Sequence, residues 1–282
     1  MIALVVLSAA ALADINVGVS VSATGPAASL GIPEKNTIAL LPTTIGGQKV
    51  NYIVLDDATD PTAATRNIKK LISENRVDVV IGSTTTPNSL AMIDVAVDNE
   101  TPLISMAGSA IVVEPMDAKR RWVFKTAQND SLAVAKIFEY LQKQKQNKVA
   151  ILTVSDGFGS SGREQLKAQA AKFGINIVSD DTYGPKDTDM TAQLTKIRGS
   201  QAQALIVWGT NPGPAVIAKN AKQLGLKLPL YMSHGVSSKK FIDLAGDAAE
   251  GIRLPSGKVL VADVLSNGDS QKKSLLAFVK DY

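Results

Sequence analysis

Two loops rich in hydroxyl groups carry the clearest chemical signal in the sequence. They are residues 82–87 (GSTTTP) and 105–109 (SMAGS), and each follows a short apolar segment. The first loop leads into a predicted helix with Pro87 at its first position and Thr86 as its N-cap. Free N–H groups and the helix dipole favour an anion at a helix N-terminus, so the two loops could hold a carboxylate by neutral hydrogen bonds. Simple capping of the helix is the alternative.

His234 is the only histidine in the chain, and it follows the predicted strand 228–231. One histidine excludes metal sites built from several histidines. A hydrolase triad would also need a serine in a G-x-S-x-G turn, which the sequence lacks. No carboxylate pair stands out for acid–base catalysis, because Asp56 and Asp57 are predicted to cap the loop before the helix at Pro61. His234 is therefore either a ligand contact at a strand end or a structural residue.

Residues 157–162 (GFGSSG) match the G-x-G-x-x-G pattern of dinucleotide-binding proteins, and Asp180 lies 23 residues after Gly157. Two features weaken this interpretation. Ser155 and Asp156 come between the preceding strand and the first glycine, and a carboxylate repels a pyrophosphate. The motif also lies in the middle of the chain. An NAD(P)-dependent oxidoreductase that uses the Gly157 loop is kept as an alternative function.

Apolar segments alternate with amphipathic ones along the chain, which predicts an α/β fold with parallel sheets and helices on both faces. In such sheets ligands bind at the carboxyl ends of the strands. The pattern restarts after Asp130, which indicates two similarly wound lobes. Strands are predicted at 15–21, 50–55, 77–81, 103–105, 149–154, 175–178, 204–207 and 228–231, and helices at 61–75, from 87, and at 131–144, 163–173, 191–198 and 215–224.

Composition excludes several classes of protein. The chain has 282 residues, of which 45% are hydrophobic and 20% charged, and it has no cysteine. This is the composition of a globular protein of about two domains. The absence of cysteine excludes disulfides, thiolate metal sites and thiol nucleophiles. The net charge of +4 comes without a basic block, so nucleic-acid binding has no compositional support.

The first 13 residues are predicted to be the remnant of a signal peptide. Residues 2–13 (IALVVLSAAALA) are too short to span a bilayer, but they fit a signal-peptide core with Ala11-Leu12-Ala13 as the cleavage site. No Lys or Arg precedes the run, so the true start codon is expected further upstream. A buried first strand is the alternative. Without a lipobox cysteine, the exported chain is predicted to be periplasmic and free of a lipid anchor.

Five motifs in order along residues 14–282 resemble those of type I periplasmic substrate-binding proteins of ABC transporters, in the branched-chain amino acid (leucine/isoleucine/valine-binding) family. They are residues 22–31 (SATGPAASLG), 56–61 (DDATDP), 105–109, 187–197 and 246–251 (GDAAEG). The resemblance implies two Rossmann-like lobes joined by three crossing strands and a hinge, with the ligand enclosed between them.

The same resemblance implies the domain boundaries. Residues 14–130 with 254–282 would form lobe 1, and residues 131–253 would form lobe 2. The third crossing is expected at about 253–265. Because family members continue well beyond this length, the C-terminal part of the fold is expected to be missing, which would leave an apolar face of lobe 1 uncovered.

The resemblance also implies a ligand site with no catalytic residue, metal or cofactor. Hydroxyl and backbone groups at Thr85, Thr86, Ala107 and Ser109 would bind the ligand carboxylate, and a tight glycine loop would deliver Phe158 to the cleft. The predicted ligand-binding residues are Ser22, Leu30, Thr85, Thr86, Ala107, Gly108, Ser109, Phe158, Thr210, Asn211, His234 and Gly235.

Three positions depart from the family pattern. His234 stands where amino-acid binders place an acid that pairs with the ligand ammonium, and a lost charge partner is costly in a dry cleft. Thr210 and Leu30 stand where an aromatic residue often occurs. These departures predict a carboxylate ligand that need not carry an amino group, such as an aromatic acid or a 2-oxo acid. Branched-chain amino acids stay open as ligands.

The predicted role is the extracytoplasmic solute-binding component of an ABC transporter. Its partners would be the small carboxylate solute and the membrane permease with its ATPase, and the chain is expected to be monomeric and to bind no nucleic acid. Besides the oxidoreductase, a sensory ligand-binding domain of the same fold is an alternative.

Overall fold

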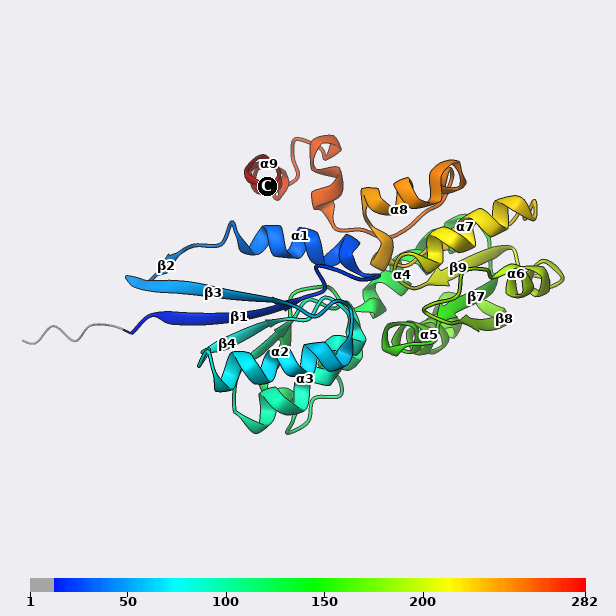
Figure 1. Ribbon diagram of the computed structural model, residues 1–282. Helices are drawn as coiled ribbons and strands as arrows, with labels where there is room; N and C mark the ends of the chain where they lie inside the picture. Colours follow the sequence, from blue (N-terminus) through cyan, green and yellow to red (C-terminus); the bar gives the residue numbers. More distant parts are fainter. Residues whose placement is uncertain (1–12) are drawn as a thin grey trace, which may run out of the picture.

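The computed structural model describes residues 13–282, and they form two parallel sheets with helices on their faces (Figure 1). The predicted signal peptide lies outside the described residues, apart from Ala13. Every helix in the described range is too short or too polar to cross a lipid bilayer. The predicted α/β class with two sheet-centred lobes is confirmed.

The first lobe is built on a six-stranded sheet in the order β2-β3-β1-β4-β5-β6, in which only β2 runs antiparallel to its neighbour. Its strands are β1 (Ile15–Val21), β2 (Thr44–Ile45), β3 (Gln48–Asp56), β4 (Val79–Gly82), β5 (Leu103–Ser105) and β6 (Val123–Lys125), and its helices are α1 (Ala28–Ile38), α2 (Pro61–Ser73) and α3 (Thr86–Asp98).

The two faces of the first sheet are covered unequally. Helices α2 and α3 pack side by side on one face, where Ile68, Leu71 and Met92 are fully buried (Figure 1). On the other face α1 packs through Ile38 against alternate residues of β1 such as Val19. Side chains alternate between the faces of a strand, so Phe124 of β6 points to this second face, where it is 54% exposed.

The second lobe is built on a four-stranded parallel sheet in the order β10-β9-β7-β8. All five residues of its strand β9 are buried, as expected of a sheet with helices on both faces. Its strands are β7 (Lys148–Val154), β8 (Asn176–Tyr183), β9 (Ala204–Trp208) and β10 (Leu230–Met232), and its helices are α4 (Asp130–Lys143), α5 (Gly157–Ala170), α6 (Thr191–Arg198), α7 (Gly213–Gln223) and α8 (Lys239–Ala245).

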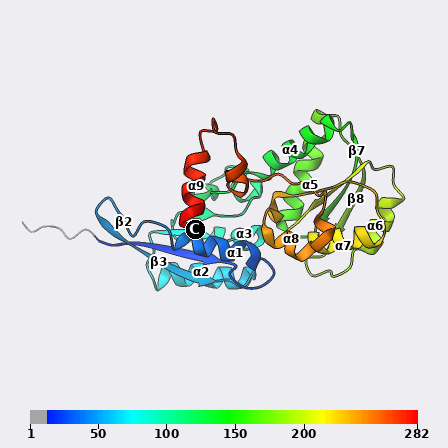
Figure 2. The same cartoon turned by 90° about the horizontal axis from the view of Figure 1, so that it is seen from above.

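The predicted third crossing at residues 253–265 is not an extended strand. Arg253 makes one parallel bridge to Tyr231, and residues Lys258–Val264 then form short 3₁₀ turns. Beyond Arg253 the chain leaves the edge of the second sheet, and the Ser237 hydroxyl donates a 3.0 Å hydrogen bond to the Pro255 carbonyl. Helix α9 (Lys272–Asp281) follows and lies beside α1, where Asn36 donates a 3.2 Å hydrogen bond to the Tyr282 hydroxyl (Figure 2). Further 3₁₀ turns are Ala110–Val112, Arg120–Trp122, Ala171–Phe173, His234–Val236 and Gly246–Ala249.

The glycine run at residues 157–162 is helical, so the prediction of a tight loop is wrong. Helix α5 begins at Gly157, because Asp156 accepts hydrogen bonds from the backbone N–H groups of Phe158 and Gly159 at 2.9 Å as its N-cap. The glycines allow close packing against the sheet. A Cβ on Gly159 would lie 1.7 Å from the Val154 carbonyl oxygen.

We expect Gly159→Ala to lower the free energy of unfolding by about 3 kcal/mol, because a methyl group there forces helix α5 away from β7. Gly199→Ala is the control, since its Cβ would lie no closer than 3.4 Å to a neighbouring atom. Urea unfolding followed by circular dichroism measures both. Equal stability of the two variants would contradict the close packing of α5.

Candidate functional site

A cavity of about 440 Å³, here called the cleft, lies between the two lobes. The first lobe contributes residues after β1, β4 and β5, and the second contributes residues after β7, β8, β9 and β10. It therefore lies where the carboxyl ends of the strands meet, as predicted. Its lining includes Pro26, Leu30, Glu34, Thr84, Thr85, Thr86, Asn88, Met106 and Gly108 from the first lobe, and Asp156, Phe158, Tyr183, Lys186, Thr210, Asn211, His234 and Gly235 from the second.

Five residues of the cleft wall carry buried polar atoms that have no hydrogen-bond partner within residues 13–282. They are Thr85 (Oγ1), Asn88 (both amide atoms), Tyr183 (hydroxyl), Asn211 (both amide atoms) and His234 (both ring nitrogens). A buried polar group without a partner costs about 1–3 kcal/mol, so such groups are rare in folded proteins. Their convergence from both lobes on one cavity indicates a polar ligand.

The two hydroxyl loops are only partly directed into the cleft. Thr85, Thr86 and Gly108 line it, whereas Ala107 is buried in the core of the first lobe and Ser109 lies behind Thr86. Thr86 is not the N-cap that the sequence predicts. It is the first helical residue, and its hydroxyl donates a 2.9 Å hydrogen bond to Ser109 Oγ instead. Thr85 occupies the N-cap position, and its own hydroxyl remains without a partner.

Ser22 lies beneath the cleft wall and binds Asp57. The Asp57 carboxylate, fully buried, accepts hydrogen bonds from the hydroxyls of Ser20 (3.1 Å), Ser22 (2.7 Å) and Ser83 (2.6 Å) and from the Thr59 N–H (3.1 Å). Asp57 caps the loop through the Thr59 N–H, as predicted, but it also has a larger role that the sequence did not show. It ties together the ends of β1, β3 and β4. The helix cap is supplied by Asp60, and the loop is held by Asp56.

The ring of His234 packs edge-on against two aromatic rings. Its centroid lies 5.5 Å from that of Phe158 and 5.6 Å from that of Trp208. On its other side a Cβ at Gly108 would lie 2.3 Å from Nε2, so only glycine fits there. Burial, with the positive charge of Lys125, lowers the pKa of His234 to about 4. The ring is neutral near pH 7 and therefore offers one donor and one acceptor.

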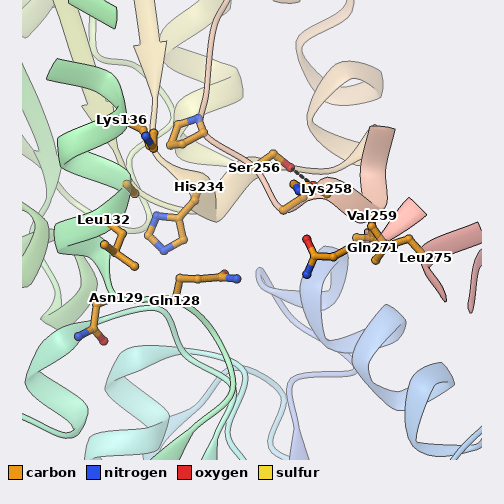
Figure 3. A pocket seen from close by; sticks show the side chains of 13 residues that line it. Gln128, Asn129, Leu132, Lys136, His234, Ser256, Lys258, Val259, Gln271 and Leu275 are labelled. Carbon is orange, nitrogen blue, oxygen red and sulfur yellow. Dashed lines mark hydrogen bonds between the residues drawn. The ribbon is translucent and has the colours of Figure 1, made fainter. Parts of the chain in front are cut away.

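His234 also lines a second cavity of about 490 Å³ (Figure 3). Its other walls come from α4 and the segment before α9, including Leu132, Lys136, Ser256 and Gln271. His234 is thus the one predicted ligand residue that borders both cavities. Among the described residues, none of the others that line this second cavity carries a buried, partnerless polar atom, whereas several in the cleft do.

Several cleft residues were not predicted from the sequence, and Glu34 is the most informative of them. It lies on α1, a helix that the sequence did not predict because Pro33 interrupts it. Thr84 donates a 2.5 Å hydrogen bond to Glu34 Oε2. Burial, with a smaller contribution from Asp57, raises the pKa of Glu34 to about 8. Its spacing of four residues from Leu30 would have placed both on one helix face.

On the opposite wall, Tyr183 is buried and Asp156 is half-buried. Burial raises the pKa of Asp156 despite its bonds to backbone N–H groups, and it raises that of Tyr183, which Asp156 raises further. The Asp156 carboxylate accepts hydrogen bonds from the N–H groups at the start of α5, and these are the groups that would otherwise bind a pyrophosphate. This arrangement disfavours the nucleotide-binding alternative.

The comparisons with known proteins agree with this architecture. A family model described as periplasmic binding protein matches residues 14–281. Leu/Ile/Val-binding protein homolog 3 of Brucella melitensis is 24% identical over 89% of this chain, and a Leu/Ile/Val-binding protein of Rhizobium johnstonii is 25% identical over 85% of it. The chain spans 69% and 66% of the length of these two relatives. A crystal structure of an extracellular ligand-binding receptor from Rhodopseudomonas palustris HaA2 superimposes with a TM-score of 0.91, at 37% identity, over 96% of this chain and 75% of that one.

We expect Asp57→Ala to lower the free energy of unfolding by about 3 kcal/mol or more, because three hydroxyls and one N–H lose a buried acceptor. Asp60→Ala, which removes only the exposed N-cap of α2, is expected to cost about 1 kcal/mol. Urea unfolding of the two variants checks the difference. Similar losses would show that the Asp57 network contributes no more to stability than an ordinary helix N-cap.

A single histidine allows its titration to be followed directly by NMR of the imidazole protons. We expect a midpoint of about 4 in the folded chain and about 6.5 in urea. Since the unfolded chain takes up the proton first, His234 makes the folded state lose stability as the pH falls from about 6.5 to about 4. A folded-state midpoint near 6.5 would mean that the ring is in contact with water.

Proposed function

The chain belongs to the periplasmic binding proteins, in the branched-chain amino acid-binding family, and we propose that it captures a small carboxylate in the cleft for uptake by an ABC transporter. The observation that carries this proposal is the set of buried, partnerless polar atoms that converge on the cleft from both lobes. A ligand with hydrogen-bonding groups would satisfy them, and it would join the two lobes while doing so.

The ligand carboxylate binds at the N-terminus of α3. Thr85 and Asn88 present free side-chain donors there, and the helix dipole favours a negative charge. Thr86 contributes through its backbone, because its hydroxyl is already used by Ser109. The Lys186 side chain lines the opposite wall and adds a positive charge on that side.

The body of the ligand is apolar. Leu30 and Met106 supply apolar surface from the first lobe, and Phe158 supplies the aromatic wall from the second. Gly235 lies so close to Phe158 that a Cβ would approach its ring to 2.9 Å, which keeps the ring in place. Asn211 and the neutral His234 then bind the polar end of the ligand that is not held by α3, with Thr210 beside them.

We favour a carboxylate without an ammonium group, such as an aromatic acid or a 2-oxo acid. A neutral imidazole at His234 gives an ammonium no charge partner. Branched-chain amino acids are the second candidate, and the names of the Brucella and Rhizobium relatives favour them.

Closure of the cleft would be a hinge motion between residues 14–130 with 254–282 and residues 131–253. Contacts at the joint support this division. Lys125 donates to the Gly108 carbonyl at 2.9 Å and to Asn129 Oδ1 at 2.8 Å. Asp130 accepts from the Ala110 N–H at 3.3 Å and from the Ser161 hydroxyl at 2.5 Å, so it touches both lobes.

In this role the protein is a monomer of the periplasm that delivers its solute to a permease with its ATPase. It performs no chemistry on the solute. A sensory role would use the same cleft, and permease genes beside its own gene would favour transport.

We expect calorimetry on refolded, ligand-free protein to show micromolar or tighter binding of at least one benzoate-type or 2-oxo acid. Thr85→Val should weaken that binding about 10-fold or more, because a hydrogen bond to a charged group is lost. Thr65→Val is the matched control, since the Thr65 hydroxyl bonds only to backbone carbonyls of α2 and α3. Tight binding of leucine with no response to the acids would contradict the favoured ligand class, and a fluorescence change with NADH would support the oxidoreductase.

A further inference from the structure

Glu34 is held in the cleft wall by a chain of hydrogen bonds. The Ser22 N–H donates to Thr84 Oγ1 at 2.9 Å, and Thr84 Oγ1 in turn donates to Glu34 Oε2 at 2.5 Å. Ser22 is itself fixed by Asp57, so the position of Oε2 is set by the buried network beneath the cleft. No described residue makes a hydrogen bond to Oε1. One oxygen of Glu34 is therefore anchored, and the other is available to a ligand in the cleft.

The surroundings of Glu34 favour its neutral form. Within residues 13–282 no Lys or Arg forms an ion pair with it, and Asp57 places a second carboxyl nearby. The other titratable groups on the cleft wall are Asp156, Tyr183, Lys186 and His234. Of these only Lys186 offers a positive charge near pH 7, and it is exposed on the opposite lobe. With its pKa raised to about 8, Glu34 carries a proton near pH 7 and is a hydrogen-bond donor.

Glu34 is also next to the proposed carboxylate position. Its partner Thr84 directly precedes Thr85, and both threonines line the cleft. A group on the ligand that meets Glu34 must therefore lie close to the carboxylate, as a substituent on carbon 2 does. Building on the proposed carboxylate site, we propose that Glu34 determines specificity by donating a hydrogen bond from its carboxyl to an oxygen on carbon 2 of the ligand.

This contact would give different affinities to three acids of similar size that differ only in the group on carbon 2. A 2-oxo or 2-hydroxy oxygen accepts the proton of Glu34. A methylene at carbon 2 leaves that donor unpaired. An ammonium at carbon 2 would place its N–H donors against the O–H donor of Glu34. Glu34 would have to lose its proton to accept from the ammonium, and the nearby Asp57 carboxyl disfavours that loss. The cleft is therefore selective for 2-oxo and 2-hydroxy acids over both the unsubstituted acid and the amino acid.

The experiment compares 4-methyl-2-oxopentanoate, 4-methylpentanoate and leucine, which share one side chain, by calorimetry on the refolded full chain. We expect the wild type to bind the 2-oxo acid about 10-fold or more tightly than the other two. Glu34→Gln keeps a donor at this position and should retain that preference within about threefold. Glu34→Ala should lose that preference, because the 2-oxo oxygen loses its donor and 4-methylpentanoate no longer leaves a donor unpaired. Glu139→Gln, on the outer surface of α4, is the matched control.

Three outcomes overturn the inference. If Glu34→Gln loses as much affinity as Glu34→Ala, then Glu34 acts as an ionised acceptor. If leucine binds best and releases a proton, measured in buffers of different ionisation enthalpy, then Glu34 pairs with the ammonium. If both variants bind like the wild type, then Glu34 does not contact the ligand. In each case the carboxylate site stands as long as the acids bind the wild type, whereas failure of every carboxylate to bind refutes the proposed function itself.

Discussion

The buried Asp57 carboxylate is the interaction on which the first wall of the cleft depends. It accepts hydrogen bonds from residues at the ends of β1 and β4 and from the loop after β3, which are three adjacent strands of one sheet. A buried charge is tolerated only when its oxygens are fully hydrogen-bonded, so these strand ends cannot move independently. Ser22 and Thr84 extend the same network to Glu34. The positions of Thr84 and Glu34 in the cleft wall thus follow from an acid that does not itself line the cleft.

The second wall depends on close packing. A Cβ at Gly162 would lie 2.2 Å from the Trp208 indole nitrogen, and one at Gly209 would lie 1.9 Å from the Tyr183 hydroxyl. These glycines let α5 and the β9 loop approach the aromatic rings, and the rings then hold His234 in place. Rigid backbone and aromatic side chains lose little conformational entropy when a ligand binds, so this wall is organised before the ligand arrives.

The electrostatic character of the cleft follows from burial. Removal from water disfavours the charged form of any titratable group, so it raises the pKa of Glu34 to about 8 and lowers that of His234 to about 4. Both groups are then neutral near pH 7, one as a donor and the other as a donor and acceptor. A wall of this kind recognises the positions of ligand oxygens rather than ligand charge. In the proposed site, the negative charge of the ligand lies at the N-terminus of α3.

The sequence by itself determined the α/β order and the strand ends at which the cleft lies, because periodicity and strand-end position are local properties. His234 was placed there by its position after a strand, and Thr85 and Phe158 were placed there by the family resemblance. It could not determine α1, since Pro33 breaks the pattern that would have revealed Glu34. Nor could it show that the 157–162 glycines are helical, that Thr86 bonds to Ser109, or that residues 258–264 form turns. The Thr86 bond depends on a neighbour distant in the sequence, and the turns depend on the lack of a strand alongside, whereas the start of α5 depends on its cap, Asp156. Only the tertiary structure brings such neighbours together and, by excluding water, decides which side chains are neutral, buried and without a partner.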